Sequence, residues 1–120
     1  MLLEGVPDVS GNSGRFVFFK VSDTDGNERY FVRSDDELGH QKIRQLFEES
    51  IIKIDRDGLL TCETLGGAFI WIKRKAQVII LDGESEALGP VRRVQTLLDL
   101  LSRNFSGSLT IHVHLEDGGN

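Results

Sequence analysis

The sequence has few cysteines, few prolines and no long apolar segment. Cys62 is the single cysteine among 120 residues, which excludes an internal disulfide and a zinc site built from several cysteines. Two prolines and 39% hydrophobic residues are typical of a globular chain and unlike a disordered one. No apolar segment approaches the roughly 20 residues that span a bilayer. We expect residues 1–120 to form a single domain with no membrane partner.

Positive charge is also scarce. The chain has 14 Lys and Arg residues against 19 Asp and Glu residues, which gives a formal net charge of −5. Because nucleic-acid binding needs a basic surface, we expect no nucleic-acid partner. The first residues, Met1 to Gly5, lack the basic start and apolar stretch of a signal peptide, and a single cysteine fits a reducing compartment. The sequence therefore predicts a cytoplasmic protein, which we expect to be a monomer.

The hydrophobic pattern predicts about six strands and two helices. Clusters of β-branched and aromatic residues between turn signals indicate strands at residues 16–21, 28–33, 59–65, 68–73, 76–81 and 109–115. Apolar residues spaced as on one helix face indicate a first helix ending near Ile52 and a second helix starting at Pro90. The resulting order, strand–strand–helix–strand–strand–strand–helix–strand, predicts an α/β (α+β) fold with one mixed sheet.

Three local signals set the expected boundaries of these elements. Ser34 and Glu37 have the spacing of a capping box, so the first helix should start directly after Ser34. Gly66 and Gly67 interrupt an apolar run and indicate a bulge or a close backbone approach between two strands. Residues 1–14 carry no periodic pattern, and we expect them to be irregular.

The stretch from Gly83 to Arg93 indicates an anion-binding site. Its small residues leave backbone N–H groups uncovered, and a helix start, which carries positive dipole character, follows at Pro90. Arg92 and Arg93 fall in the expected first turn of that helix, where cations oppose the helix dipole. Their presence predicts a bound negative group, and phosphate is the obvious one.

Among the candidate catalytic residues, His40 stands out. It lies near the start of the first helix and close in sequence to Arg33, which predicts a base or nucleophile beside an anion-binding group. His112 and His114 share one face of a strand, but no third ligand completes a metal site. Cys62 alternates with apolar residues along a strand, which indicates a packed side chain.

Three motifs resemble those of the Janus/Ocnus family. Cys62 to Gly67 reads Cys-Glu-Thr-Leu-Gly-Gly, similar to the family's Cys-Glu-x-Leu-Gly-Gly, and Ser85 to Pro90 resembles its Ser-x-Ala-x-Gly-Pro. Val6 to Val9 is similar to the family's N-terminal Pro-Asp-Val. The enzymatic member of this family is a small phosphohistidine phosphatase of animals. The resemblance covers most of the chain.

The resemblance implies roles for individual residues. His40 matches the catalytic histidine of the family, and Arg33 falls one residue nearer the histidine than the family's active-site arginine. Ser85 and Ala87 match positions whose side chain and backbone N–H groups hold the phosphate.

Two positions depart from the family pattern. The phosphate-binding lysine lands on Val17 in one alignment and on Arg15 in the other, and both positions share one face of a strand. A second histidine of the family lands on Arg93, which keeps a positive charge there.

The resemblance predicts a metal-independent phosphatase that needs no cofactor and acts on phosphohistidine in proteins or peptides. His40 would act as general base or nucleophile, while the loop from Ser85 to Ala87, with Arg33, Arg15 and Arg93, would hold the phosphate. The alternative is a non-catalytic phosphate-binding or regulatory protein of the same fold, which the missing lysine supports. A structural partner protein that uses the acidic surface is a third class, and it leaves the paired arginines unexplained.

Overall fold

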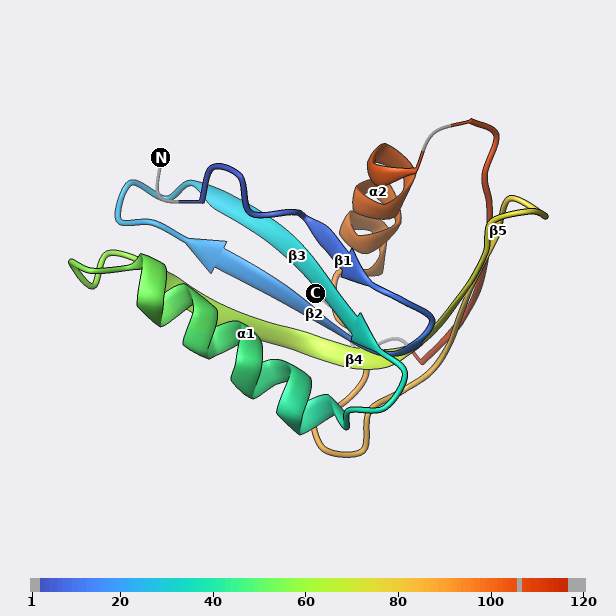
Figure 1. Cartoon of the computed structure of the whole chain (residues 1–120), viewed down its shortest axis with the longest axis horizontal. Coiled ribbons are helices and arrows are strands. Elements are labelled where there is room, and N and C mark those ends of the chain that lie inside the picture. The colour runs from blue at the N-terminus through green and yellow to red at the C-terminus, as the bar shows by residue number, and fades with distance from the viewer. Residues whose placement is uncertain (1–2, 106, 117–120) are drawn as a thin grey trace.

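The computed structural model describes residues 3–105 and 107–116, in which six strands form one sheet between two helices (Figure 1). The helices are α1 (His40–Ile54) and α2 (Val94–Asn104). The strands are β1 (Val9–Gly11), β2 (Gly14–Ser22), β3 (Glu28–Asp35), β4 (Thr61–Lys73), β5 (Val78–Gly83) and β6 (Thr110–Leu115).

The sheet has the order β1-β3-β2-β4-β5-β6. The outer pairs, β1 with β3 and β5 with β6, are parallel, whereas the inner pairs are antiparallel. The sheet is therefore mixed, and the predicted fold class is confirmed. Helix α1 connects β3 to β4, and these two strands lie on either side of β2.

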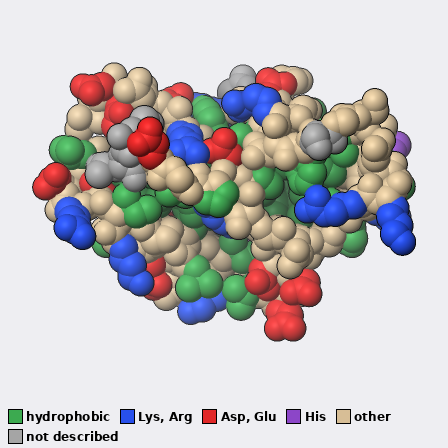
Figure 2. All heavy atoms as spheres, turned by 45° about the horizontal axis from the view of Figure 1, so that its top comes forward, with side chains coloured by type: hydrophobic (Ala, Val, Ile, Leu, Met, Phe, Trp, Pro, Cys, Tyr) green, Lys and Arg blue, Asp and Glu red, His purple; other side chains and the backbone are tan. Residues whose placement is uncertain are grey.

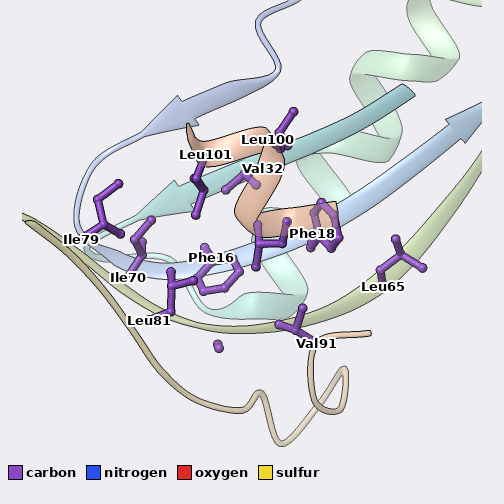
Figure 3. Close-up of a cluster of buried hydrophobic side chains, with 12 residues drawn as sticks. Phe16, Phe18, Val32, Leu65, Ile70, Ile79, Leu81, Val91, Leu100 and Leu101 are labelled. Atoms are coloured by element: carbon purple, nitrogen blue, oxygen red, sulfur yellow. The ribbon is translucent and has the colours of Figure 1, made fainter. Parts of the chain in front are cut away.

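The alternation of side chains along β2 creates two hydrophobic cores. Phe16 and Phe18 belong to the cluster that α2 covers, which Figure 3 shows in close-up, and Val17 and Phe19 belong to the cluster that α1 covers. All four side chains are 0% exposed. In the α1 cluster the rings of Phe19 and Phe47 stack with their centroids 4.1 Å apart. Because neighbouring residues of one strand point to opposite faces, the two helices must pack on opposite sides of the sheet.

Two details of the strands differ from the prediction. Val9–Gly11, expected to be irregular, forms β1, because the carbonyl of Asp8 accepts the N–H of Val32 at 2.7 Å and aligns the segment with β3. The two strands expected on either side of Gly66 and Gly67 are one strand, β4. Leu65 and Gly66 form a bulge opposite Phe18, since the register against β2 shifts between Val17, which pairs with Gly67, and Phe19, which pairs with Thr64.

Both helices start later than the sequence predicts. The capping box at Ser34 is wrong, because Asp35 ends β3 and its Oδ1 accepts the N–H groups of Glu37 and Leu38 at 2.8 and 2.9 Å, which makes a turn. Helix α1 instead follows Gly39, which as N-cap residue supplies no side-chain hydrogen bond.

Helix α2 starts at Val94 rather than at Pro90. The N–H of Arg92 donates to the carbonyl of Leu65 at 2.8 Å, so the segment before α2 is held against β4. Arg93 then adopts a left-handed conformation with φ 57° as the N-cap residue.

The described surface carries mixed charges. On the face drawn in Figure 2, Lys and Arg side chains are separated from one another and interspersed with Asp and Glu. None of the helices within residues 3–105 and 107–116 is long and apolar enough to span a membrane.

The bulge in β4 predicts an unequal response to two Gly→Ala substitutions. Gly66 has φ +100°, and a Cβ there would collide with the backbone carbonyl of Pro90, whereas Gly58 has φ +67° with no atom within 4 Å of its Cβ position. We expect Gly58→Ala to lower the free energy of unfolding by about 1 kcal/mol through backbone strain alone. Gly66→Ala should cost more than about 3 kcal/mol, because a backbone collision is added. Urea denaturation measures both, and equal losses would contradict the close approach.

Cys62 should be a slow nucleophile. Burial, and then the charge of Glu48, raises the pKa of its thiol from 9.0 to about 11. The thiolate fraction near pH 7.5 is then roughly 100-fold below that of an ordinary thiol. We expect iodoacetamide to alkylate Cys62 about 100-fold more slowly in the folded chain than in urea.

The raised pKa of the Cys62 thiol also makes the free energy of unfolding depend on pH. The folded state holds the thiol proton more tightly, so its contribution is present below pH 9 and is lost as the pH rises towards 11. A Cys62→Ala variant should lack that part of the alkaline loss in the free energy of unfolding. In the alkylation experiment, equal rates for Cys62 in the folded and the unfolded chain would contradict the raised pKa of its thiol.

Candidate functional site

A cleft with a volume of about 480 Å³ lies at the N-terminal end of α1. It is lined by Arg15 from β2, Phe69 from β4, residues 39–41 at the start of α1, and residues 84–87 from the loop after β5. Segments from four distant parts of the sequence therefore meet here, on the sheet face that α1 covers.

The imidazole of His40 is held in one orientation. Its Nε2 lies 2.8 Å from the carbonyl oxygen of Ala68, and because a carbonyl only accepts, Nε2 carries the proton. In the neutral imidazole the lone pair is then on Nδ1. The ring also meets the ring of Phe69 edge-on, with centroids 5.4 Å apart, and His40 is only 9% exposed. The contacts select one tautomer and leave Nδ1 as the nitrogen available for chemistry.

The absence of a side chain at Gly67 leaves room for the imidazole of His40 on the sheet. A Cβ at this position would lie 2.8 Å from Cδ2 of His40 and 2.8 Å from the carbonyl oxygen of Phe16. The missing side chain allows the histidine to rest directly on β4, beside the bulge.

The loop after β5 is docked onto the same glycine. Ser85 donates its N–H to the carbonyl of Gly67 at 2.8 Å, and Gly67 donates its N–H to the carbonyl of Gly89 at 3.2 Å. The Ser85 side chain is 1% exposed and its Oγ accepts the N–H of Leu88 at 3.0 Å. Between these anchors the described residues supply no acceptor for the N–H groups of residues 86 and 87. The loop thus presents fixed, free donors to the cleft.

The start of α1 supplies further free donors. The carbonyl of Gly39 accepts the N–H groups of Lys42 and Ile43, each at 3.1 Å, whereas the N–H groups of His40 and Gln41 have no acceptor among the described residues. Residues 39–41 line the cleft, so the positive end of the α1 dipole faces it. Backbone donors from a loop and from a helix start are the kind of groups that bind anions in proteins.

This arrangement corrects one part of the sequence interpretation. The loop lines the cleft, but the helix start beside it is that of α1, not that of α2.

Arg15 is the guanidinium that lines the cleft. It pairs with Phe69 across β2 and β4, and its Cζ lies 5.9 Å from the centroid of that ring. Val17, the other position on which the family lysine falls, is 0% exposed and packs in the α1 core. Of the two alternatives, the structure therefore places only Arg15 in the lining of the cleft, which His40 also lines.

Arg33 lies in a different groove, between α1 and β3. Its Cζ is 5.1 Å from the ring centroid of Phe47 and 5.5 Å from that of Phe31, and its Nη1 donates to the carbonyl of Val32 at 2.9 Å. Burial lowers the pKa of this guanidinium, and the charge of Asp8 opposes the change. The structure does not bring Arg33 to the cleft.

Arg92 and Arg93 lie on the opposite sheet face. Nη1 of Arg93 donates to the hydroxyl of Tyr30 at 2.6 Å, and Tyr30 packs against the α2 core. Arg92 donates to the carbonyl of Thr64 at 2.8 Å and lies 3.3 Å from a carboxylate oxygen of Glu63. Groups of the protein, rather than the cleft, thus surround the two arginines that the sequence linked to an anion.

Besides Gly39, four residues of the cleft were not among the candidate site residues of the sequence interpretation. Gln41 and Phe69 line it from α1 and β4, and Glu84 and Glu86 line it from the loop. The two acids alternate with Ser85 along the chain, a signal that the sequence contained. Their carboxylates limit the positive charge of the cleft, so its suitability for an anion depends on directed N–H groups more than on net charge.

The histidines of β6 do not line this cleft. His112 and His114 are exposed, and no group of three or more His, Cys, Asp or Glu side chains among the described residues is placed to hold a metal ion.

Comparison with protein families gives a match over most of the chain. The model of the Janus/Ocnus family (Ocnus) matches residues 3–108, a span that contains every residue of the cleft. No curated protein sequence matches the chain significantly.

The affinity for inorganic phosphate, measured in arginine variants, tests which arginine contributes to the cleft. We expect Arg15→Gln to weaken phosphate binding about 5-fold to 10-fold, because it removes the guanidinium that lines the cleft. The matched variant Arg93→Gln should bind phosphate as the parent does, since its side chain lies on the other sheet face. Phosphorus NMR titration measures both affinities. A larger loss in Arg93→Gln than in Arg15→Gln would show that the anion site lies elsewhere.

Proposed function

The chain belongs to the Janus/Ocnus family, and from that premise we propose that it is a metal-independent protein phosphohistidine phosphatase. The observation that carries the proposal is the state of His40. Its Nε2 is engaged by the carbonyl of Ala68, which leaves the Nδ1 lone pair for chemistry in a cleft lined with free N–H donors.

The cleft suits the transfer of a phosphoryl group from nitrogen. Such transfer passes through a loose transition state with charge spread over three phosphoryl oxygens, so catalysis requires placement and charge stabilisation. The free N–H groups of the loop and of α1 approach from two sides, and Arg15 adds a full charge from a third. The hydroxyl of Ser85 has no acceptor among the described residues and is available as a further donor.

His40 serves in one of two ways. As a nucleophile, Nδ1 forms a bond to phosphorus while the P–N bond of the substrate breaks, and the released imidazole takes a proton from water. Water then hydrolyses the phosphorylated His40. As a general base, Nδ1 takes a proton from a water molecule as that water attacks phosphorus and the P–N bond breaks, and His40 then returns the proton to the departing ring nitrogen of the substrate. Both routes need the neutral imidazole, and the Ala68 bond selects the tautomer that both use.

Hydrolysis of a phosphohistidine peptide, followed by phosphorus NMR, tests the proposal. We expect His40→Ala to lower kcat/KM by about 10²–10⁴-fold, the range for loss of a general base. Arg93→Gln is the control, because that side chain lies on the other sheet face, bound to Tyr30, and it should leave kcat/KM unchanged. A chelator should have no effect on the parent.

The outcomes separate the candidates. Unchanged turnover in His40→Ala contradicts the catalytic assignment, and a strict metal requirement contradicts the mechanism. Phosphate binding without hydrolysis of any phosphohistidine substrate would instead identify a non-catalytic phosphate-binding protein of the same fold. Phosphorylated His40, found by mass spectrometry after rapid quenching, would select the nucleophilic route.

A further inference from the structure

An apolar surface continues from the cleft along β4 and β5. Trp71, the single tryptophan of the chain, is 40% exposed. Its ring stacks on that of Phe69 with the centroids 6.1 Å apart, and Phe69 is itself a wall of the cleft. Ile80 pairs with Trp71 across the two strands. We call Phe69, Trp71 and Ile80 the apolar platform.

The alternation of residues places the platform on the cleft side of the sheet. Ile79 and Leu81 are 0% exposed in the α2 core, so Ile80 between them points to the other face. Helix α1 does not extend over this part of the sheet: Figure 1 shows it alongside β2 and the beginning of β4, with β5 standing apart from it.

Polar side chains surround the platform. Arg15 and Asp82 pair with Phe69 from the two neighbouring strands, and His112 pairs with Ile80 from β6. An apolar centre with aromatic residues and a polar rim is the usual anatomy of a protein-binding surface. Exposed tryptophan in particular is enriched among residues that dominate binding energy.

We propose that the platform binds the chain of a peptide or protein substrate and selects an apolar side chain two residues from the phosphorylated one. This inference rests on the proposed function. In an extended peptide, residues two apart point the same way and are separated by about 6.6 Å. That spacing matches the 6.1 Å between the rings of Phe69 and Trp71. When the phosphoryl group occupies the cleft beside Phe69, the side chain two positions along lies on Trp71.

Paired peptides test the platform. One probe is Gly-Leu-Gly-phosphohistidine-Gly-Leu-Gly, the other has glycine in place of both leucines, and free phosphohistidine is the substrate without a flanking chain. We expect the parent to hydrolyse the leucine peptide with a kcat/KM about 5-fold to 10-fold above that of the glycine peptide. Trp71→Thr, which keeps a β-branched residue in the strand, should remove that preference and leave turnover of free phosphohistidine unchanged.

Leu46→Ala is the matched control variant. Leu46 is 44% exposed, close to Trp71 in this respect, but it lies on α1 in the groove beside Arg33. It should keep the full preference for the leucine peptide. Equal turnover of both peptides by the parent overturns the platform and leaves the phosphatase proposal intact.

Trp71 also reports binding without turnover, because it is the single tryptophan. If no phosphohistidine substrate is hydrolysed, the phosphatase proposal fails, and fluorescence titration of the parent decides the platform separately. A blue shift with the leucine peptide that exceeds the shift with the glycine peptide supports it. An unchanged spectrum overturns it, and so does a shift with AMP but not with the peptides, which would indicate a nucleobase ligand.

Discussion

The close approach of three segments at Gly66 and Gly67 is the constraint on which the rest of the site depends. The backbone of Gly67 binds Ser85 through its carbonyl and Gly89 through its N–H, and its absent side chain makes room for the ring of His40. Gly66 lies so close to the carbonyl of Pro90 that a Cβ would collide with it. A side chain at either position would separate the loop, the helix start and the strand that form the cleft.

The anion binding proposed for the cleft rests on geometry more than on charge. The donors are backbone N–H groups of the loop and of α1, fixed by hydrogen bonds within the fold, so the proposed binding requires no rearrangement of them. Arg15 is the guanidinium on its wall, whereas Glu84 and Glu86 oppose a high positive potential. Such a site favours an anion that fits the donors over anions in general. The Ala68 carbonyl acts in the same manner on His40, since it selects the tautomer without adding charge.

The sequence predicted more of the fold than of the site. Runs such as residues 16–21 identify their own strand, because alternation along one segment shows which side chains are buried. The start of α1 escaped this reasoning, since Asp35 and Glu37 suit a cap and a turn equally well and only the extent of β3 decides between them. In the site, His40, Ser85 and Ala87 were found from local motifs, and the structure places all three in one cleft. Arg33 and Arg93 were assigned to the site because they lie near its other residues in the sequence. Nearness in the sequence does not show the face to which a side chain points.

What the sequence determined by itself is the two helices, the strands other than β1, with β4 divided into two, the apolar faces of β2 and the helices, and the small-residue loop with its free donors. What the tertiary structure decided is which helix start meets that loop, and whether Arg15 or Val17 reaches the cleft. The physical reason is that periodicity within a segment fixes a side chain's face, whereas its neighbours depend on the register between strands. Val17 lies opposite Gly67 and Arg15 opposite Phe69 only because β4 carries a bulge. The register is set by the pairing of the two strands, so it cannot be determined from the sequence of either strand alone.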